Sequence, residues 1–267
     1  MKLSLLQVRI DAADRTGTQN RVEAEIQAAA AEGADLIALP ELWNVGYFAS
    51  DQYEAAAEPL SGPTLERIAG LAAEHEVAIV AGSVIEDLAE TDGETPAETG
   101  LANTSVVFGP DGDRRATYRK RHLFGYESAE ATLLTAGETL GVAEIGDFTV
   151  GITTCYDLRF PELYRELVDA GVTAVVVPSA WPYPRVEHWK TLTRARAVEN
   201  LFYVAAINGV GPAGGDSGLI GRSRVVDPWG TTVRAGGTEP ERIEAEIDPD
   251  RVAAVRERFP ALRDRTV

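Results

Sequence analysis

The sequence lacks several features that other classes of protein require. A single cysteine among 267 residues excludes an internal disulfide, so nothing indicates an oxidising compartment. There is no run of about 18 apolar residues, and the charges of Lys2 and Arg9 fall where a signal peptide would need an apolar core. We therefore expect a cytoplasmic protein that does not bind a membrane.

Positive charge is also scarce. The chain has 42 Asp and Glu against 25 Lys and Arg, a net charge of −17, which speaks against nucleic acid as a partner. Lysine occurs only at positions 2, 120 and 190. Few lysines and many acids are typical of halophilic proteins, whose hydrated carboxylates keep the surface soluble in a high-salt cytoplasm. GC-rich coding, which also replaces lysine with arginine, is the alternative.

The apolar residues, 45% of the chain, are enough for a large core. Short apolar runs alternate with amphipathic stretches, which is typical of an α/β protein. Helices are predicted at 21–32, 64–76, 161–170 and 188–200, and a glycine-rich loop at 208–221. No linker divides the chain, so residues 1–267 are predicted to form one domain. Strands are predicted at 3–10, 34–39, 77–85, 103–108, 114–118, 148–154, 172–177, 202–207, 224–227, 231–234 and 242–247.

The only thiol, Cys155, lies where a predicted strand meets a predicted helix. The apolar run ends at Thr154, and Pro161 suits the first turn of the following helix. A turn from strand to helix exposes a side chain beside backbone N–H groups and the positive end of a helix, and both favour a thiolate. Cys155 is therefore a candidate nucleophile, although an isolated cysteine after an apolar run is more often a small buried hydrophobe.

Three other candidates lie at or beyond the ends of predicted strands. Glu41 comes directly after a buried strand and Pro40, where a carboxylate is either a helix cap or a catalytic base. Lys120 is an ammonium in a chain that otherwise uses arginine, and the two groups are not interchangeable. Glu127 follows in the same segment. Taken singly, Lys120 and Glu127 would be ordinary surface charges.

Three sequence blocks together resemble the signature of a known family. They are LPELW at 39–43, YRKRHLF at 118–124 and GITTCYDLRFPEL at 151–163. In order and approximate spacing they are similar to the blocks of the nitrilase superfamily of carbon–nitrogen hydrolases, and RARAVEN at 194–200 resembles a later family helix. The resemblance covers almost the whole chain. It implies a four-layer αββα sandwich with a Glu, Lys, Cys catalytic set.

The same residues suit the chemistry of amide hydrolysis, which needs a nucleophile, a base, an oxyanion ligand and an acid for the leaving amine. Cys155 would attack, and Glu41 would take its proton and pass it to ammonia. Lys120 and the backbone N–H of Tyr156 would stabilise the oxyanion. The resemblance also implies that Glu127 orients substrate or water. No metal or other cofactor is required, and the three His residues show no ligand spacing.

Within the family, the segment CYDLRF at 155–160 most resembles amidases of small carboxylated amides, such as omega-amidases. Arg159 could bind the substrate carboxylate through its fork of donors, unless it pairs with Asp157 or Glu162. Hydrolysis of a nitrile or an N-carbamoyl compound uses the same catalytic set and stays open.

Two alternative functions lie outside this class. A Cys–His hydrolase of the peptidase type would use His122 or His188 as its base. A catalytically idle binding or regulatory subunit would have no reason to keep Glu41, Lys120 and Cys155 together.

Assembly is predicted from the helix at 161–170. Family members commonly pair through this helix, and Leu163, Tyr164, Leu167 and Val168 are expected to form two apolar stripes on it. One stripe would face the sheet and the other a second copy, which predicts a homodimer.

The dependence of stability on salt concentration distinguishes the two explanations of the acid excess. If the carboxylates form a halophilic surface, their repulsion destabilises the fold in dilute buffer and is screened by ions. Thermal unfolding in KCl should then show a midpoint that rises well beyond ~1 M. A midpoint that does not change between about 0.1 and 3 M would favour coding bias.

Overall fold

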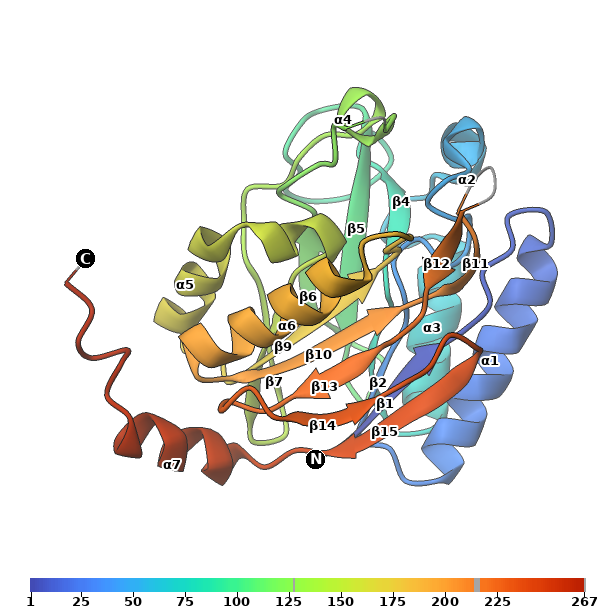
Figure 1. The fold of residues 1–267 in the computed structure, drawn as a ribbon. Coiled ribbons are helices and arrows are strands. Elements are labelled where there is room, and N and C mark those ends of the chain that lie inside the picture. Colours follow the sequence, from blue (N-terminus) through green and yellow to red (C-terminus); the bar gives the residue numbers. More distant parts are fainter. Residues whose placement is uncertain (127, 214–216, 267) are drawn as a thin grey trace.

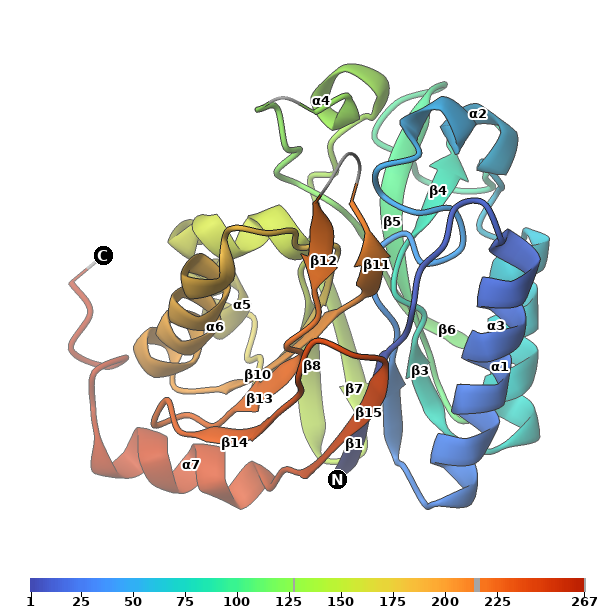
Figure 2. The ribbon, with the colours of Figure 1, turned by 45° about the vertical axis from the view of Figure 1, so that its right-hand side comes forward.

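Two β-sheets pack face to face, with helices on both outer faces (Figure 1, Figure 2). The computed structural model describes residues 1–126, 128–213 and 217–266. Its order of layers is helices, sheet, sheet, helices, which confirms the expected αββα sandwich. The prediction of a single domain remains a prediction.

The first sheet carries the N-terminal half of the chain. Helices α1 (Arg15–Ala31) and α3 (Pro63–Glu74) cover its outer face. Strands β1, β2 and β3 pair in parallel, and the remaining pairs are antiparallel. In spatial order the strands are β15 (Glu241–Glu246), β1 (Lys2–Gln7), β2 (Leu36–Ala38), β3 (Ala78–Val80), β5 (Leu101–Phe108) and β4 (Val84–Asp87), with β6 (Arg114–Arg119) also beside β5.

The second sheet carries the C-terminal half. Helices α5 (Pro161–Asp169) and α6 (Val186–Asn200) lie on its outer face, and α7 (Pro249–Arg258) follows the last strand of the chain. In spatial order the strands are β14 (Thr232–Ala235), β13 (Arg224–Val226), β10 (Tyr203–Asn208), β9 (Ala174–Ser179), β8 (Phe148–Ile152) and β7 (Gly141–Ile145). The short elements are η1 (Ser50–Gln52), α2 (Tyr53–Ala56), α4 (Glu130–Leu133) and η2 (Cys155–Arg159).

Apolar side chains on both faces of the strands explain the near-continuous apolar runs in the sequence. In β1, Leu3 and Leu5 join the core between the sheets, whereas Leu6 joins the core under α1 and α3. Neighbouring residues of a strand point to opposite faces, so each apolar strand serves two cores. Packing between the sheets thereby brings the ends of β2, β6, β8 and β9 into one region of the molecule.

Several predicted boundaries were wrong for identifiable reasons. The segment 77–85 is not one strand, because Gly82 adopts φ +66° and separates β3 from β4. Helix α1 begins before residue 21, because the Asp14 carboxylate caps it by accepting the N–H of Gly17 at 2.9 Å. The segment 208–221 is not only loop, since it contains the hairpin of β11 (Val210–Pro212) and β12 (Gly218–Ile220).

The expected second apolar stripe on α5 was also wrong. Leu163, Tyr164 and Leu167 are all buried in the core, and the partly buried Val168 packs against the same core. No helix in the described ranges is both long and apolar enough to cross a membrane.

Gly82 also supports the loop that carries Glu41. A Cβ at Gly82 would lie 2.1 Å from the carbonyl oxygen of Pro40 and 2.8 Å from the Trp43 ring. Gly33 offers a matched control, because its φ of +84° is similar but nothing lies within 4 Å of an added Cβ.

We expect Gly82→Ala to cost about 3 kcal/mol from backbone strain and collision, and Gly33→Ala about 1 kcal/mol from strain alone. The midpoint of thermal unfolding should fall by ~6 °C or more in the first variant and by ~2–4 °C in the second. Equal shifts would show that close approach at Gly82 is unimportant.

Candidate active site

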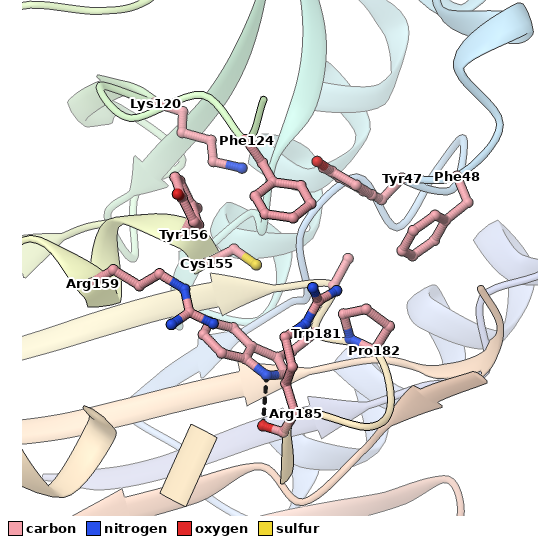
Figure 3. Close-up of a pocket in the computed structure, with 11 residues that line it drawn as sticks. Tyr47, Phe48, Lys120, Phe124, Cys155, Tyr156, Arg159, Trp181, Pro182 and Arg185 are labelled. Carbon is pink, nitrogen blue, oxygen red and sulfur yellow. Dashed lines mark hydrogen bonds between the residues drawn. The ribbon is translucent and has the colours of Figure 1, made fainter. Parts of the chain in front are cut away.

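Cys155 lies at a sharp turn after β8. Its backbone adopts φ +46°, a left-handed conformation that is strained for a residue with a Cβ. The carboxylate of Asp157 stabilises the turn by accepting the N–H of Thr154 at 2.8 Å, and the N–H of Asp157 donates to the Thr154 carbonyl at 3.0 Å. The thiol is 9% exposed and faces a pocket (Figure 3).

Asp157 is held by neighbouring elements as well. It accepts the Tyr118 hydroxyl at 2.6 Å and the backbone N–H of His122 at 3.1 Å, and it lies 2.7 Å from Nδ1 of His122. The His122 ring stacks on Phe160 with centroids 3.7 Å apart. His122 therefore belongs to the scaffold of the turn, which argues against a Cys–His hydrolase.

Glu41 is fully buried at the end of the segment that follows β2. Its Oε2 accepts the backbone N–H of Ala180 at 2.9 Å, directly after β9 of the second sheet. Its Oε1 accepts Nδ2 of Asn103 at 2.9 Å and Nζ of Lys120 at 2.8 Å. The Glu41 carboxylate also lies close enough to the Cys155 thiol for its charge to raise the pKa of that thiol. Glu41 is thus placed to exchange a proton with Cys155.

Lys120, directly after β6, is buried between two carboxylates. Besides Glu41, its Nζ donates to Oε1 and Oε2 of Glu130 at 2.7 and 2.9 Å. The Glu130 carboxylate also accepts the Tyr47 hydroxyl at 3.0 Å and the Phe124 N–H at 2.8 Å. Glu130 therefore has no freedom to move away from Lys120.

Neither Glu130 nor Asn103 was among the site residues predicted from the sequence. The prediction named Glu127 as the second acid, and that residue lies outside the described residues. Glu127 and Glu130 are both acids in the segment after Lys120, and no local pattern separates them. Glu130 is the first residue of α4, and hydrogen bonds from Tyr47 and Asn103 hold its carboxylate inward.

The charges of the site depend on one another. Burial alone would lower the pKa of Lys120, but the charges of Glu130 and Glu41 outweigh it and hold that pKa well above the usual value. Burial raises the pKa of Glu41, and the Lys120 charge only partly opposes this. Lys120 is therefore a permanent cation, while the raised pKa suits Glu41 to take up a proton.

The expected thiolate at Cys155 is not supported. Burial raises the pKa of the thiol well above its usual value, and the charge of Glu41 raises it further. Helix α5 begins only at Pro161, and the short turn η2 separates it from Cys155. The helix terminus is thus too far along the chain to offset burial, so the thiol keeps its proton until Glu41 removes it.

Five aromatic residues and three cations are among the eleven residues that line the pocket above Cys155 (Figure 3). The guanidinium of Arg159 lies 5.1 Å from the Trp181 ring centroid and 5.8 Å from that of Tyr156. Its Nη2 is 3.1 Å from Nδ1 of His188. The residues around the pocket are Tyr47, Phe48, Lys120, Phe124, Cys155, Tyr156, Arg159, Ala180, Trp181, Pro182 and Arg185.

The structural alternative for Arg159 does not hold within the described ranges. Arg159 forms no ion pair there with Asp157 or Glu162, and Asp157 is occupied by Tyr118 and His122. Tyr156 lines the pocket, and its contact with substrate stays a prediction. Tyr47, Trp181 and Arg185 come from loops and were not singled out in the sequence analysis.

Comparison with known proteins gives close likenesses over most of the chain. The chain is 37% identical over 236 residues to a protein of Paenarthrobacter nicotinovorans named 2-oxoglutaramate amidase, covering 87% of this chain and 78% of that protein. It is 32% identical over 274 residues to omega-amidase NIT2 of Homo sapiens, covering 99% and 94%. A solved CN-hydrolase superfamily protein of Xanthomonas campestris, with an arsenic adduct in its active site, matches with a TM-score of 0.89 and 32% identity over 100% of this chain and 97% of that chain.

The predicted class of enzyme, a hydrolase of non-peptide carbon–nitrogen bonds, is confirmed. The family described as carbon–nitrogen hydrolase matches residues 2–257. The chain belongs to this family, within the nitrilase superfamily.

Proposed function

We propose that the enzyme hydrolyses the terminal amide of a short dicarboxylic acid monoamide, including its 2-oxo form, to the acid and ammonia. The observation that carries this proposal is the Cys155 thiol facing Glu41, Lys120 and Glu130 at the base of a pocket that also contains Arg159. Two relatives named 2-oxoglutaramate amidase and omega-amidase support the choice of substrate.

The first half of the reaction forms a thioester. Cys155 Sγ attacks the amide carbon while its proton moves to the Glu41 carboxylate. Lys120 and the backbone N–H of Tyr156 stabilise the oxyanion of the tetrahedral intermediate. The intermediate collapses, the C–N bond breaks, and the proton on Glu41 passes to the leaving nitrogen, which departs as ammonia.

The second half consumes water. Glu41, again ionised, removes a proton from a water molecule that attacks the thioester carbon. The C–S bond breaks, the acid leaves, and the proton returns through Glu41 to Sγ. Glu130 acts through Lys120 as a positioning residue, because it holds the ammonium at one point beside Glu41.

The shape of the pocket favours an amide with a distant anion. Arg159 lies against two aromatic rings, which fix the plane of its guanidinium, and a planar fork of donors binds a carboxylate through two hydrogen bonds. A neutral aliphatic amide would leave this cation unused.

Three further properties stay predictions from the sequence alone. They are the cytoplasmic location, the homodimer and the adaptation to high salt. The homodimer now has to use a surface other than the second stripe expected on α5, because the apolar residues of that helix pack inward.

We expect Cys155→Ala to abolish hydrolysis without unfolding the protein, since loss of one sulfur atom leaves only a small cavity. Ammonia release measures the loss. Mass spectrometry of wild-type enzyme mixed rapidly with a carboxylated amide should show one acyl group on Cys155. Turnover by the alanine variant above ~1% of wild type would rule out the thioester route.

The two acids after Lys120 can be separated by paired variants. Glu130→Gln should lower kcat ~100-fold, because Lys120 loses one of its two fixed carboxylate partners and shifts from the oxyanion. Glu127→Gln is the matched change three residues earlier in the same segment. We expect it to keep kcat within about threefold of wild type, whereas the reverse order of effects would restore Glu127 as the second acid.

Arg159→Leu tests the substrate charge. The variant should raise KM for glutaramate, the monoamide of glutaric acid, at least about tenfold, because a bidentate ion pair is lost. KM for the neutral valeramide, which has the same chain length, should change little, the pattern expected for lost ground-state binding. Equal losses on both amides would assign Arg159 to the fold of the turn.

A further inference from the structure

A buried asparagine joins the two carboxylates of the site, and the mechanism above gives it no role. Asn103 lies in β5 and is fully buried. Its Nδ2 donates to Oε1 of Glu41 at 2.9 Å and to Oε1 of Glu130 at 3.2 Å. Because both partners are carboxylates, only the NH2 side of the amide can face them. The two amide hydrogens of Asn103 are therefore committed to the two acids.

Lys120 uses the same two oxygen atoms. Its Nζ donates to Oε1 of Glu41 at 2.8 Å and to Oε1 of Glu130 at 2.7 Å. The amide nitrogen and the ammonium thus form a closed ring with the two Oε1 atoms. The backbone N–H of Lys120 also donates to the Asn103 carbonyl at 2.9 Å, so the backbone holds the two donors side by side.

The two oxygens of Glu41 differ in the hydrogen bonds that they accept. Oε1 accepts from Lys120 and Asn103, which uses both of its lone pairs. Among the described residues, Oε2 accepts only the N–H of Ala180 at 2.9 Å, so one lone pair stays open to a further donor. Burial raises the pKa of the Cys155 thiol, and this N–H partly opposes the rise, so the thiol lies near the N–H that Oε2 accepts.

We propose that Asn103 is a positioning residue of the reaction, which together with Lys120 occupies Oε1 of Glu41 and leaves Oε2 to exchange the proton with Cys155. The inference rests on the proposed function, because it needs Glu41 to act as the base. The proton leaves Sγ for Oε2 as the C–S bond forms, and it leaves Oε2 for the departing nitrogen as the C–N bond breaks. Without the Asn103 amide, Oε1 would compete for this proton and the carboxylate would lose one of its fixed contacts.

The ionisable groups around Glu41 determine what a pH profile reports. In the described part of the chain, the groups that face it are Lys120, Glu130, Cys155, Tyr47 and Tyr53. Burial raises the pKa of the thiol and of both hydroxyls, and despite burial the two carboxylates hold the pKa of the lysine well above its usual value. The acid limb of the profile therefore reports the carboxylate pair. Hydrogen bonds from Asn103 favour the ionised form of both acids, so loss of the amide should move this limb to higher pH.

The test compares Asn103→Leu with the matched control Asn200→Leu. Leucine has nearly the shape of asparagine but no donor. Asn200, at the end of α6, is also fully buried, and its Nδ2 donates to the Arg196 carbonyl at 2.8 Å and not to a carboxylate. Both substitutions remove a buried amide, so both should lower the midpoint of thermal unfolding.

Only Asn103→Leu should change the pH dependence of glutaramate hydrolysis. We expect the acid limb of kcat/KM to move up by about one pH unit and the plateau of kcat to fall ~10-fold. KM should stay within about twofold of wild type, because Asn103 is not one of the described residues that line the pocket. Asn200→Leu should leave the acid limb, kcat and KM unchanged.

Alkylation by iodoacetamide gives a second readout that needs no hydrolysis. The chain has no thiol other than Cys155, whose sulfur displaces iodide while its proton moves to Glu41. The pH dependence of the alkylation rate should shift in Asn103→Leu by the same amount, about one unit. If wild type hydrolyses no carboxylated amide, the proposed function fails, and alkylation still decides the role of Asn103.

Asn103→Ala provides a second variant that adds no bulk. An acid limb within ~0.3 pH unit of wild type in both Asn103 variants, or an equal shift in Asn200→Leu, would overturn the inference. A crystal structure of the wild-type enzyme tests it without any substitution. Sγ of Cys155 should lie nearer to Oε2 than to Oε1 of Glu41, and the reverse order would also overturn it.

Discussion

The buried ammonium of Lys120, held between the carboxylates of Glu41 and Glu130, is the interaction on which the site depends. Each charge would be costly in the interior alone, and removal of one partner leaves another without compensation. The three groups come from the segments after β2 and β6 and from the start of α4. Their mutual attraction therefore holds these three segments close together at the site.

The turn at Cys155 has a separate support. A left-handed residue persists only where its surroundings stabilise it, and Asp157 provides this with bonds to Thr154, Tyr118 and His122. The Asp157 carboxylate thus stabilises the turn, whereas the Glu41 carboxylate acts on the thiol. The difference lies in their partners, because Asp157 accepts from a hydroxyl and two backbone N–H groups, whereas Glu41 accepts from Lys120 and lies beside Cys155.

Much of this arrangement could be predicted from the sequence. The alternation of apolar runs and amphipathic stretches indicated the α/β class, and Glu41, Lys120 and Cys155 were recognised because each lies near a strand end in a recurring block. The second acid could not be recognised, because the segment after Lys120 has two glutamates and the inward direction of Glu130 depends on tertiary contacts with Tyr47 and Asn103.

The protonation state of Cys155 could not be predicted from the local sequence either. A turn between strand and helix suggested a thiolate. In the structure the η2 turn separates Cys155 from α5, and burial is the main cause of the raised pKa of the thiol. Arg185 was missed for a similar reason, since one loop arginine among the 22 arginines of the chain carries no sign of the pocket that it lines. Both features depend on distance in space, which sequence spacing does not give.

The bonds of Glu41 to the second sheet have a consequence for how the enzyme loses activity. Its carboxylate accepts the N–H of Ala180, and its own N–H donates to the Ser179 carbonyl at 3.4 Å, so the base is fastened across the gap between the sheets. A small slip of one sheet past the other would break these bonds while the strands within each sheet stayed paired. Catalysis should therefore be a more sensitive indicator of the relative position of the sheets than circular dichroism, and we expect inactivation on heating to precede the loss of secondary structure.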